Sequence, residues 1–272
     1  MNPPKVCFPL WRRPIYVKPA IKLISDIIHI NDTLNRTEEI MIKMTAKIIL
    51  ACLFLASQPL FAQTPQAVVP VEQEPLHRVV FHNKNARIYD AEFSPGVTCL
   101  FHKHSFDSVT IAASGGTGMN EILGLTPQQF TAPTGAAWFT KGTNAPYTHR
   151  IQNVDTTPLR FIAVEVLASA SPPGVPAVLD AVPGHKLVVE NDRVKVYRVS
   201  VDPKQSTGVR SRTSPWMRIS VSPATISVQE QGKSTETLET KTGDFRWHEG
   251  ATNQSIENVG STTYVAYEIE WK

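Results

Sequence analysis

After residue 62, apolar and polar residues alternate along short segments that are rich in β-branched side chains. The first half contains RVVFH, ARIYDAEF, SVTIAAS and LRFIAVEVL, and the second half contains KLVVE, VKVYRVSV, MRISVS and YVAYEIEW. Alternation with a period of two is typical of strands that bury one face. Turn residues separate the segments, and no long helical periodicity occurs in this part. The pattern therefore predicts an all-β sandwich or barrel.

The chain repeats itself at an offset of 108 residues. Residues 77–95 (HRVVFHNKNARIYDAEFSP) align with residues 185–203 (HKLVVENDRVKVYRVSVDP), and after a three-residue gap the offset becomes 105. A repeat of this length indicates two homologous domains rather than a solenoid. We predict a first domain over 76–167 and a second over 185–272, joined by a linker rich in Pro and Ala over 168–184.

The front of the chain has the composition of a leader. Residues 41–62 hold a basic start, an apolar stretch and a small, polar end, as in a signal peptide. The apolar stretch is too short for a bilayer span, so no stable membrane anchor is predicted. A lipoprotein site at Cys52 is the less favoured alternative, because the apolar stretch lies mostly after it. We expect a periplasmic or secreted protein, in which residues 1–40 are a mis-annotated extension and residues 63–75 are a loose tail.

Composition narrows the classes of partner. The chain has 272 residues with 27 Lys and Arg against 24 Asp and Glu, but residues 63–272 hold 19 basic and 20 acidic side chains. A near-neutral body offers no electrostatic footprint for nucleic acid, so nucleic-acid partners are excluded. Cys99 is the only cysteine after residue 62, so no intramolecular disulfide is available there. A small-molecule ligand is expected, and homodimerisation is left open.

Histidines supply the candidate chemistry of the first domain. His102 and His104 are two residues apart, and side chains two apart on a strand point to the same face. Two imidazoles on one face can bind one metal ion. A further histidine, His149, precedes Asn153 by four residues. The segment around the histidine pair reads Gly96, five residues, His102-Lys103-His104, three residues, Ser108, six residues and Gly115.

These spacings resemble the two motifs of the cupin superfamily, and the resemblance covers nearly all of residues 75–272. It implies two tandem cupin domains, which are jelly-roll-type β-barrels, in an exported bicupin. It also implies that His102, His104 and His149 are the metal ligands of the first barrel. Ser108 replaces the glutamate of the first motif. A set of histidines alone is similar to the sites of thiol and gentisate-type dioxygenases, which favours Fe(II), with Mn, Zn or Ni as alternatives.

Three neutral imidazoles leave a divalent ion with its full charge and an open position. An anionic or chelating small molecule is therefore the expected ligand. A dioxygenase-type or other metal-dependent enzyme is one hypothesis, and a non-catalytic barrel that binds a sugar or an organic acid is the alternative. A third hypothesis is an exported structural protein with a relict histidine set. No catalytic residue is assigned, because nothing in the sequence locates Tyr147 or Glu121 in a pocket.

Three further residues near the motif are interpreted as structural. Asp107 lies at odd spacing from the histidines, so we expect it on the opposite face, beside the site or at the surface. Cys99 is also at odd spacing from His102 and is interpreted as a buried thiol that faces away from it. Asn153 is expected to line the pocket or to end a strand, without binding metal.

The second copy lacks the ligand set. Arg210 and Arg212 stand at the positions of His102 and His104, and Gln254 stands at that of His149. A guanidinium has no lone pair to donate, so no metal is expected in this barrel. The favoured interpretation is that both arginines lie on a solvated rim or that the strand is shifted in register by one residue. If they are buried, Glu268, Glu270 or an anionic ligand is the expected partner. His248 is expected to be exposed, and the domain to be a structural or dimerising partner.

Overall fold

The computed structural model describes residues 67–169, 179 and 181–272, together with the helical residues 36, 38–41, 43–45 and 47. The chain divides into two units, Met1–Thr64 and Pro65–Lys272. The extension predicted over 1–40, the signal peptide predicted over 41–62 and the middle of the predicted linker lie largely outside the described residues. Those assignments stay predictions. Within the described part of the chain, no helix has the length and apolar character that a membrane span needs.

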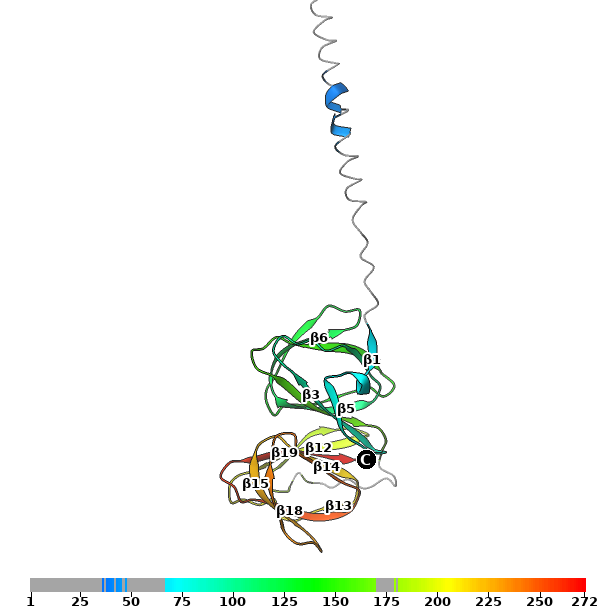
Figure 1. Ribbon diagram of the computed structural model, residues 1–272. Helices are drawn as coiled ribbons and strands as arrows, with labels where there is room; N and C mark the ends of the chain where they lie inside the picture. The colour runs from blue at the N-terminus through cyan, green and yellow to red at the C-terminus, as the bar shows by residue number, and fades with distance from the viewer. Residues whose placement is uncertain are drawn as a thin grey trace, which may run out of the picture. The chain divides into compact units, whose positions relative to one another are not determined.

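The first barrel consists of two five-stranded sheets, in agreement with the predicted all-β class (Figure 1). One sheet has the order β1 (Val68–Pro70), β4 (Phe101–His104), β9 (Tyr147–Asn153), β6 (Gly116–Ile122) and β7 (Gln128–Ala132). The other has the order β2 (His77–His82), β3 (Ala86–Phe93), β10 (Leu159–Val166), β5 (Asp107–Ser114) and β8 (Ala137–Thr140).

Part of the segment expected to be a loose tail is ordered, so that prediction is wrong for its second half. Strand β1 pairs in parallel with β4, and Val71–Gln73 form a short 3-10 helix, η1. Val71 is buried. The pairing gives the tail backbone hydrogen bonds from an edge strand, which a local pattern of Pro and Gln does not reveal.

The second barrel repeats the first. One sheet has the order β11 (His185–Glu190), β12 (Val194–Val201), β19 (Tyr264–Trp271), β14 (Trp216–Ser220) and β17 (Phe245–His248). The other has the order β13 (Arg210–Arg212), β18 (Thr252–Asn258), β15 (Ala224–Glu230) and β16 (Glu236–Thr240). Each strand of the second barrel has a counterpart in the same place in the first barrel, and β1 of the first barrel has no counterpart in the second.

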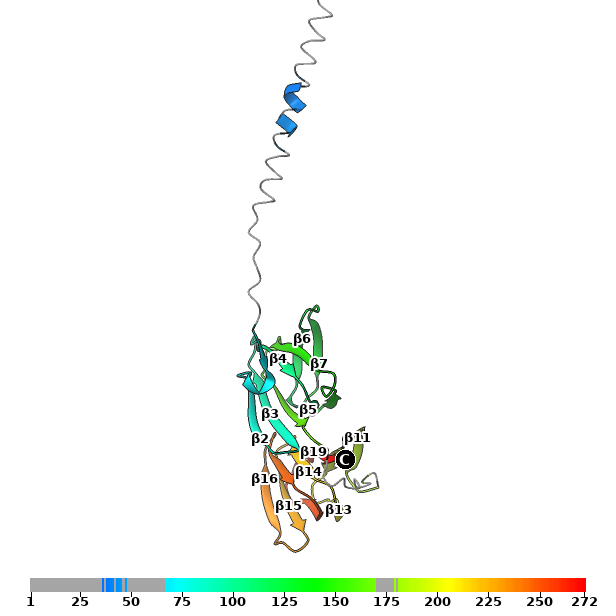
Figure 2. The ribbon, with the colours of Figure 1, turned by 90° about the vertical axis from the view of Figure 1, so that its right-hand side faces the viewer.

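A hydrophobic cluster joins the two barrels through the outer faces of the sheets that contain β10 and β19. Both figures show β14 and β19 beside the first barrel (Figures 1 and 2). Because these sheets bury both faces, every residue of β10 except Arg160 is buried, although the strand still alternates between two environments. The cluster includes Ile88, Val109, Ile162 and Val164 from the first barrel and Val196, Met217, Ile269 and Trp271 from the second.

Candidate metal centre

Four histidines meet inside the first barrel, and we call them the histidine cluster. His77 begins β2, His102 and His104 lie on β4, and His149 lies on β9 directly opposite His102. The exposed Lys103 between the two β4 histidines points outward, as strand alternation predicted. The ring centroid of His102 lies 4.3 Å from that of His77, 5.0 Å from that of His104 and 4.6 Å from that of His149.

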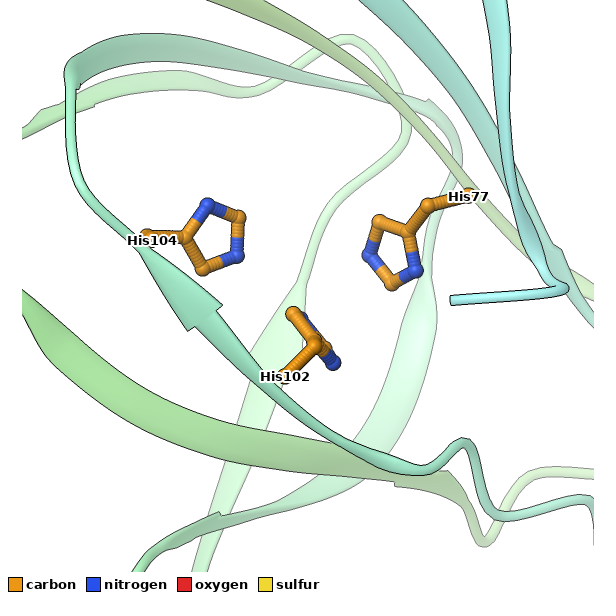
Figure 3. Close-up of side chains that lie close together, drawn as sticks. All are labelled: His77, His102 and His104. Carbon is orange, nitrogen blue, oxygen red and sulfur yellow. The ribbon is translucent and has the colours of Figure 1, made fainter. Parts of the chain in front are cut away.

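Three members of the cluster present nitrogen atoms close enough to share one ion. The ligand atoms of His77, His102 and His104 all lie within 4.8 Å of one another, and all three side chains are buried. Figure 3 shows the three rings turned toward a common space. The sequence did not identify His77 as a ligand. His77 lies on β2, well before the motif histidines on β4. The one sequence feature that drew attention to it was the internal repeat, which places His185 at the same position of the second domain.

His149 belongs to the cluster but not to this closest group. Its ring centroid lies 5.1 Å from that of His104. The sequence-predicted trio therefore meets in one place, and the structure adds His77 to it. Ligation by His149 stays a prediction.

Outer partners hold three of the four rings with Nε2 free for an ion. Nδ1 of His77 lies 2.7 Å from a carboxylate oxygen of Glu74, and Nδ1 of His102 lies 2.9 Å from the carbonyl oxygen of Leu100. Nδ1 of His149 lies 2.8 Å from the side-chain oxygen of Asn120. Because each partner oxygen accepts a hydrogen bond, each Nδ1 is the donor in its pair, which leaves Nε2 as the nitrogen that can bind an ion. Histidines that bind metals are oriented in this way.

The fourth ring has a carboxylate nearby. Nδ1 of His104 lies 3.9 Å from Glu165, whose other oxygen accepts hydrogen bonds from Arg87 and Tyr89. Burial opposes ionisation of Glu165, but His104 and Arg87 hold the pKa of this carboxyl below its usual range. Glu165 lies directly opposite Ser108 on the neighbouring strand. The carboxylate next to the site thus comes from β10, while the motif position that usually holds Glu is a serine.

Burial keeps the imidazoles of His102 and His149 neutral. Desolvation, aided by the neighbouring His77, lowers the pKa of His102 to about 3. Desolvation also lowers the pKa of His149 well below its usual value. The Nε2 atom of His102 is buried without a hydrogen-bond partner. Such an atom is costly to bury unless something binds it, and a divalent ion fits this donor set.

The cluster lies at one end of a cavity of about 430 Å³. Its walls are mostly apolar and aromatic, and the described residues that line it include no Lys, Arg, Asp or Glu. The polar groups in the wall are few, as is typical of small-molecule sites. The main lining side chains are those of Phe93, Phe130, Trp138, Phe161, Thr110 and Asn120.

The sequence could not show whether Tyr147 or Glu121 lies in a pocket, and the structure gives a different answer for each. Tyr147 lines the cavity, and its ring stacks on that of His104 at 5.0 Å. Burial raises the pKa of Tyr147 to about 12, so its hydroxyl stays protonated. Glu121 is not among the lining residues and accepts a hydrogen bond of 2.6 Å from Arg150.

The expectation that Cys99 faces away from His102 is wrong. Its sulfur lies 3.8 Å from Nδ1 of His102, because Cys99 precedes the start of β4 and strand alternation does not extend to it. The thiol accepts the backbone N–H of Ile151, and burial raises its pKa to about 11. Cys99 is therefore the neutral buried thiol that the sequence suggested.

Asp107 and Asn153 have structural roles. Asp107 accepts hydrogen bonds of 2.9 Å from the backbone N–H groups of Gly142 and Thr143 and is absent from the cavity lining. Asn153 ends β9, fully buried, and donates to the carbonyl oxygens of Phe93 and Thr157. Neither residue belongs to the group that could hold a metal.

In the second barrel, a buried ion cluster occupies the place of the histidines. Arg210 and Arg212 both donate hydrogen bonds to Glu268, and the Arg210 bond measures 2.7 Å. The favoured expectation of a solvated rim is therefore wrong, because both side chains lie inside the barrel with a buried carboxylate between them. His248 is also not exposed as expected. Its ring stacks on Trp216 at 4.0 Å.

Comparisons with known proteins place the chain by fold. No protein-family model matches it, and no curated protein matches it in sequence. AerE from Microcystis aeruginosa aligns with a TM-score of 0.53 at 10% identity, over 73% of this chain and 98% of that one. Salicylate 1,2-dioxygenase from Pseudaminobacter salicylatoxidans aligns with a TM-score of 0.52 at 14% identity, over 74% and 77%. A cupin domain from Bordetella pertussis covers 36% of this chain and 94% of its own, with a TM-score of 0.31 at 18% identity.

At these identities the likeness concerns the fold alone. The described barrels have the bicupin fold, as the motif spacing and the internal repeat predicted. A buried group of three histidines lies in the first of them.

Proposed function

We propose that the first barrel binds one divalent metal ion and is a metal-dependent enzyme of dioxygenase type. The observation that carries the proposal is the histidine cluster, in which buried rings are oriented by outer acceptors at the end of an apolar cavity. Fe(II) is the favoured ion, and Mn, Zn or Ni are alternatives. When bound, such an ion supplies Lewis acidity and, in the case of iron, redox chemistry toward dioxygen.

The cavity lining supports a substrate with an apolar or aromatic body. Since no Lys or Arg lines the described cavity, an anionic or chelating group on the substrate finds favourable charge only at the histidine end. Trp138 and Phe161, whose rings are in edge contact, also line the cavity and can pack against the substrate body. The protonated hydroxyl of Tyr147 can donate a hydrogen bond to a substrate oxygen.

One observation favours the alternative, a non-catalytic barrel that binds a small organic acid. No carboxylate lines the described cavity, so the groups there best suited to accept a proton are the histidines, which a bound ion would occupy. An enzyme at this site would therefore hold the ion through these histidines and would draw on its Lewis acidity rather than on a separate side-chain base.

Metal analysis combined with oxygen uptake tests the proposal. The full chain, purified without a histidine tag, is analysed by elemental mass spectrometry beside H102A and H104A. The matched control is H82A, which removes an exposed histidine from the same strand as His77. We expect about one equivalent of metal in the wild type and in H82A, and loss of metal in the two site variants.

Oxygen consumption with a panel of hydroxybenzoates then separates the two functions. Iron together with oxygen uptake supports the enzyme, whereas stoichiometric metal without turnover of any chelating aromatic acid supports the binding barrel. A wild-type protein that holds no metal, and that gains no stability when Fe(II), Mn, Zn or Ni is added, refutes the metal-dependent enzyme and leaves the binding barrel and the structural protein.

We also propose that the protein is exported, on the signal-like composition of residues 41–62. Mass spectrometry of the protein from its native cells should find an N-terminus at Gln63. Peptides from residues 1–40 would contradict the interpretation of these residues as a mis-annotated extension.

A further inference from the structure

The second barrel has a cavity of its own, about 320 Å³ in volume, in the place that corresponds to the apolar cavity of the first barrel. The correspondence follows from strand register. In the first barrel, Ala163 lies opposite Thr110, which lies opposite Trp138. In the second, Glu268 lies opposite Arg218, which lies opposite Arg246. The same row across the sheet is thus neutral in one barrel and charged in the other.

Arg218 connects this cavity to the buried ion cluster. Its side chain is 3% exposed, lines the cavity, and donates a hydrogen bond of 2.9 Å from Nη1 to the side-chain oxygen of Gln254. Arg246 also lines the cavity but donates two hydrogen bonds to Glu236, which neutralise its charge. The lining also includes the exposed carboxylates of Glu239 and Asp244, so Arg218 is the only buried charged side chain among the described lining residues.

Buried positive charge exceeds buried negative charge around this cavity. Arg210, Arg212 and Arg218 are 1%, 2% and 3% exposed, and Arg210 and Arg212 share the carboxylate of Glu268. The other buried carboxylate of the strand, Glu270, lies opposite Lys195 in the ladder.

Three guanidinium nitrogens of this cluster, Nη2 of Arg210 and Nε and Nη1 of Arg212, are buried without a hydrogen-bond partner. Arg210 and Arg212 do not line the cavity, so these nitrogens mark buried positive charge beside it rather than a ligand site within it.

We propose that the cavity of the second barrel binds a compact oxyanion through Arg218. A guanidinium binds the two oxygens of a carboxylate or a phosphate with parallel hydrogen bonds, which makes Arg the side chain suited to this ligand. Leu238 and Phe245 line the same cavity and can contact a short carbon chain. The shared ligand chemistry is that of a small organic carboxylate or of free phosphate. The two barrels therefore hold sites of opposite character, a metal-centred site and an arginine-centred site.

Isothermal titration calorimetry on the chelator-treated full chain tests this site without the metal centre. The probes are succinate, inorganic phosphate and the neutral analogue succinamide. We expect succinate or phosphate to bind with a stoichiometry of one, and succinamide not to bind. The probe that binds more tightly identifies the source of the oxyanion. Equal binding of succinate and succinamide overturns the proposal. So does the absence of binding of both anions when each is added at a 10-fold molar excess to protein at millimolar concentration.

Variants locate the binding. R218M should weaken binding at least 10-fold, since it removes a charge-assisted pair of hydrogen bonds, while R218K should restore part of it. K186Q removes an equal charge from an exposed position and should bind like the wild type. If R218M does not fold, L238W decides, because it fills the cavity from its half-buried edge. Unchanged binding in a folded R218M or L238W protein overturns the proposal. The metal-free format makes this result independent of the function proposed for the first barrel.

Discussion

Removal of the Glu268 charge is expected to lower the free energy of unfolding of the second barrel more than the removal of a surface charge does. Glu268 is fully buried and accepts hydrogen bonds from Arg210 and Arg212, with Nε2 of His185 3.0 Å away. In E268Q the side-chain volume is kept, but two buried guanidinium groups lose the carboxylate that neutralises them. The loss is therefore electrostatic rather than a loss of packing.

The magnitude follows from the cost of an uncompensated buried charge. Breaking a buried pair by removing one partner lowers the free energy of unfolding by about 3–5 kcal/mol. For a folded unit of this size, each 1 kcal/mol shifts the melting temperature by about 2–4 °C, so we expect a drop of about 6–20 °C. Part of this drop should be absent in a variant that also replaces both arginines by apolar residues, R210L/R212M/E268A, because no buried charge then remains.

Denaturant titration followed by tryptophan fluorescence measures the effect, with Trp216 and Trp271 as buried reporters in this barrel. E190Q is the matched control, because Glu190 pairs with Lys195 and Lys272 on the exposed surface, and it should unfold like the wild type. If E268Q stays within about 1 kcal/mol of the wild type, Glu268 does not carry the buried charges and the reasoning fails.

Three further predictions concern the duplication, pH and the strand ends. The first variant gives the second barrel the side chains of the first through R210H, R212H, R218T, Q254H and E268A. Elemental analysis should find a second equivalent of metal in this variant, and an unchanged metal content would contradict the equivalence of the two sites. Burial and the nearby Arg218 lower the pKa of His248 to about 4, below the usual value of 6.5 that it has in the unfolded chain. The unfolded state therefore binds a proton first, and the free energy of unfolding should decrease as the pH falls from 6.5 toward 4. H248Q should flatten this part of the stability profile, and an identical profile in the variant would show that the ring does not resist protonation. N258A removes hydrogen bonds to the carbonyl oxygens of Val201 and Thr262 and should cost about 1–3 kcal/mol in chemical denaturation, whereas wild-type stability would mean that water replaces the amide.

The sequence predicted the architecture because its signals are local. Alternation of apolar and polar residues gives strands, and an internal repeat gives two domains of one kind. The pair His102 and His104 points to one face for the same local reason, and the exposed Lys103 between them confirms it. The replacement of both by arginine predicts, from side-chain chemistry alone, that the second barrel does not bind metal.

Contacts between strands that are distant in sequence decided the rest. His77 joins the histidine cluster because β2 brings it there, and the buried Glu165 comes from β10, opposite the motif position that is a serine. The burial of Arg210 and Arg212, predicted to lie on a solvated rim, has the same origin, because only the folded barrel places Glu268 between them. Strand periodicity determines which residues share a face, but the pairing of strands and the packing of sheets determine which face is buried and which charges meet there.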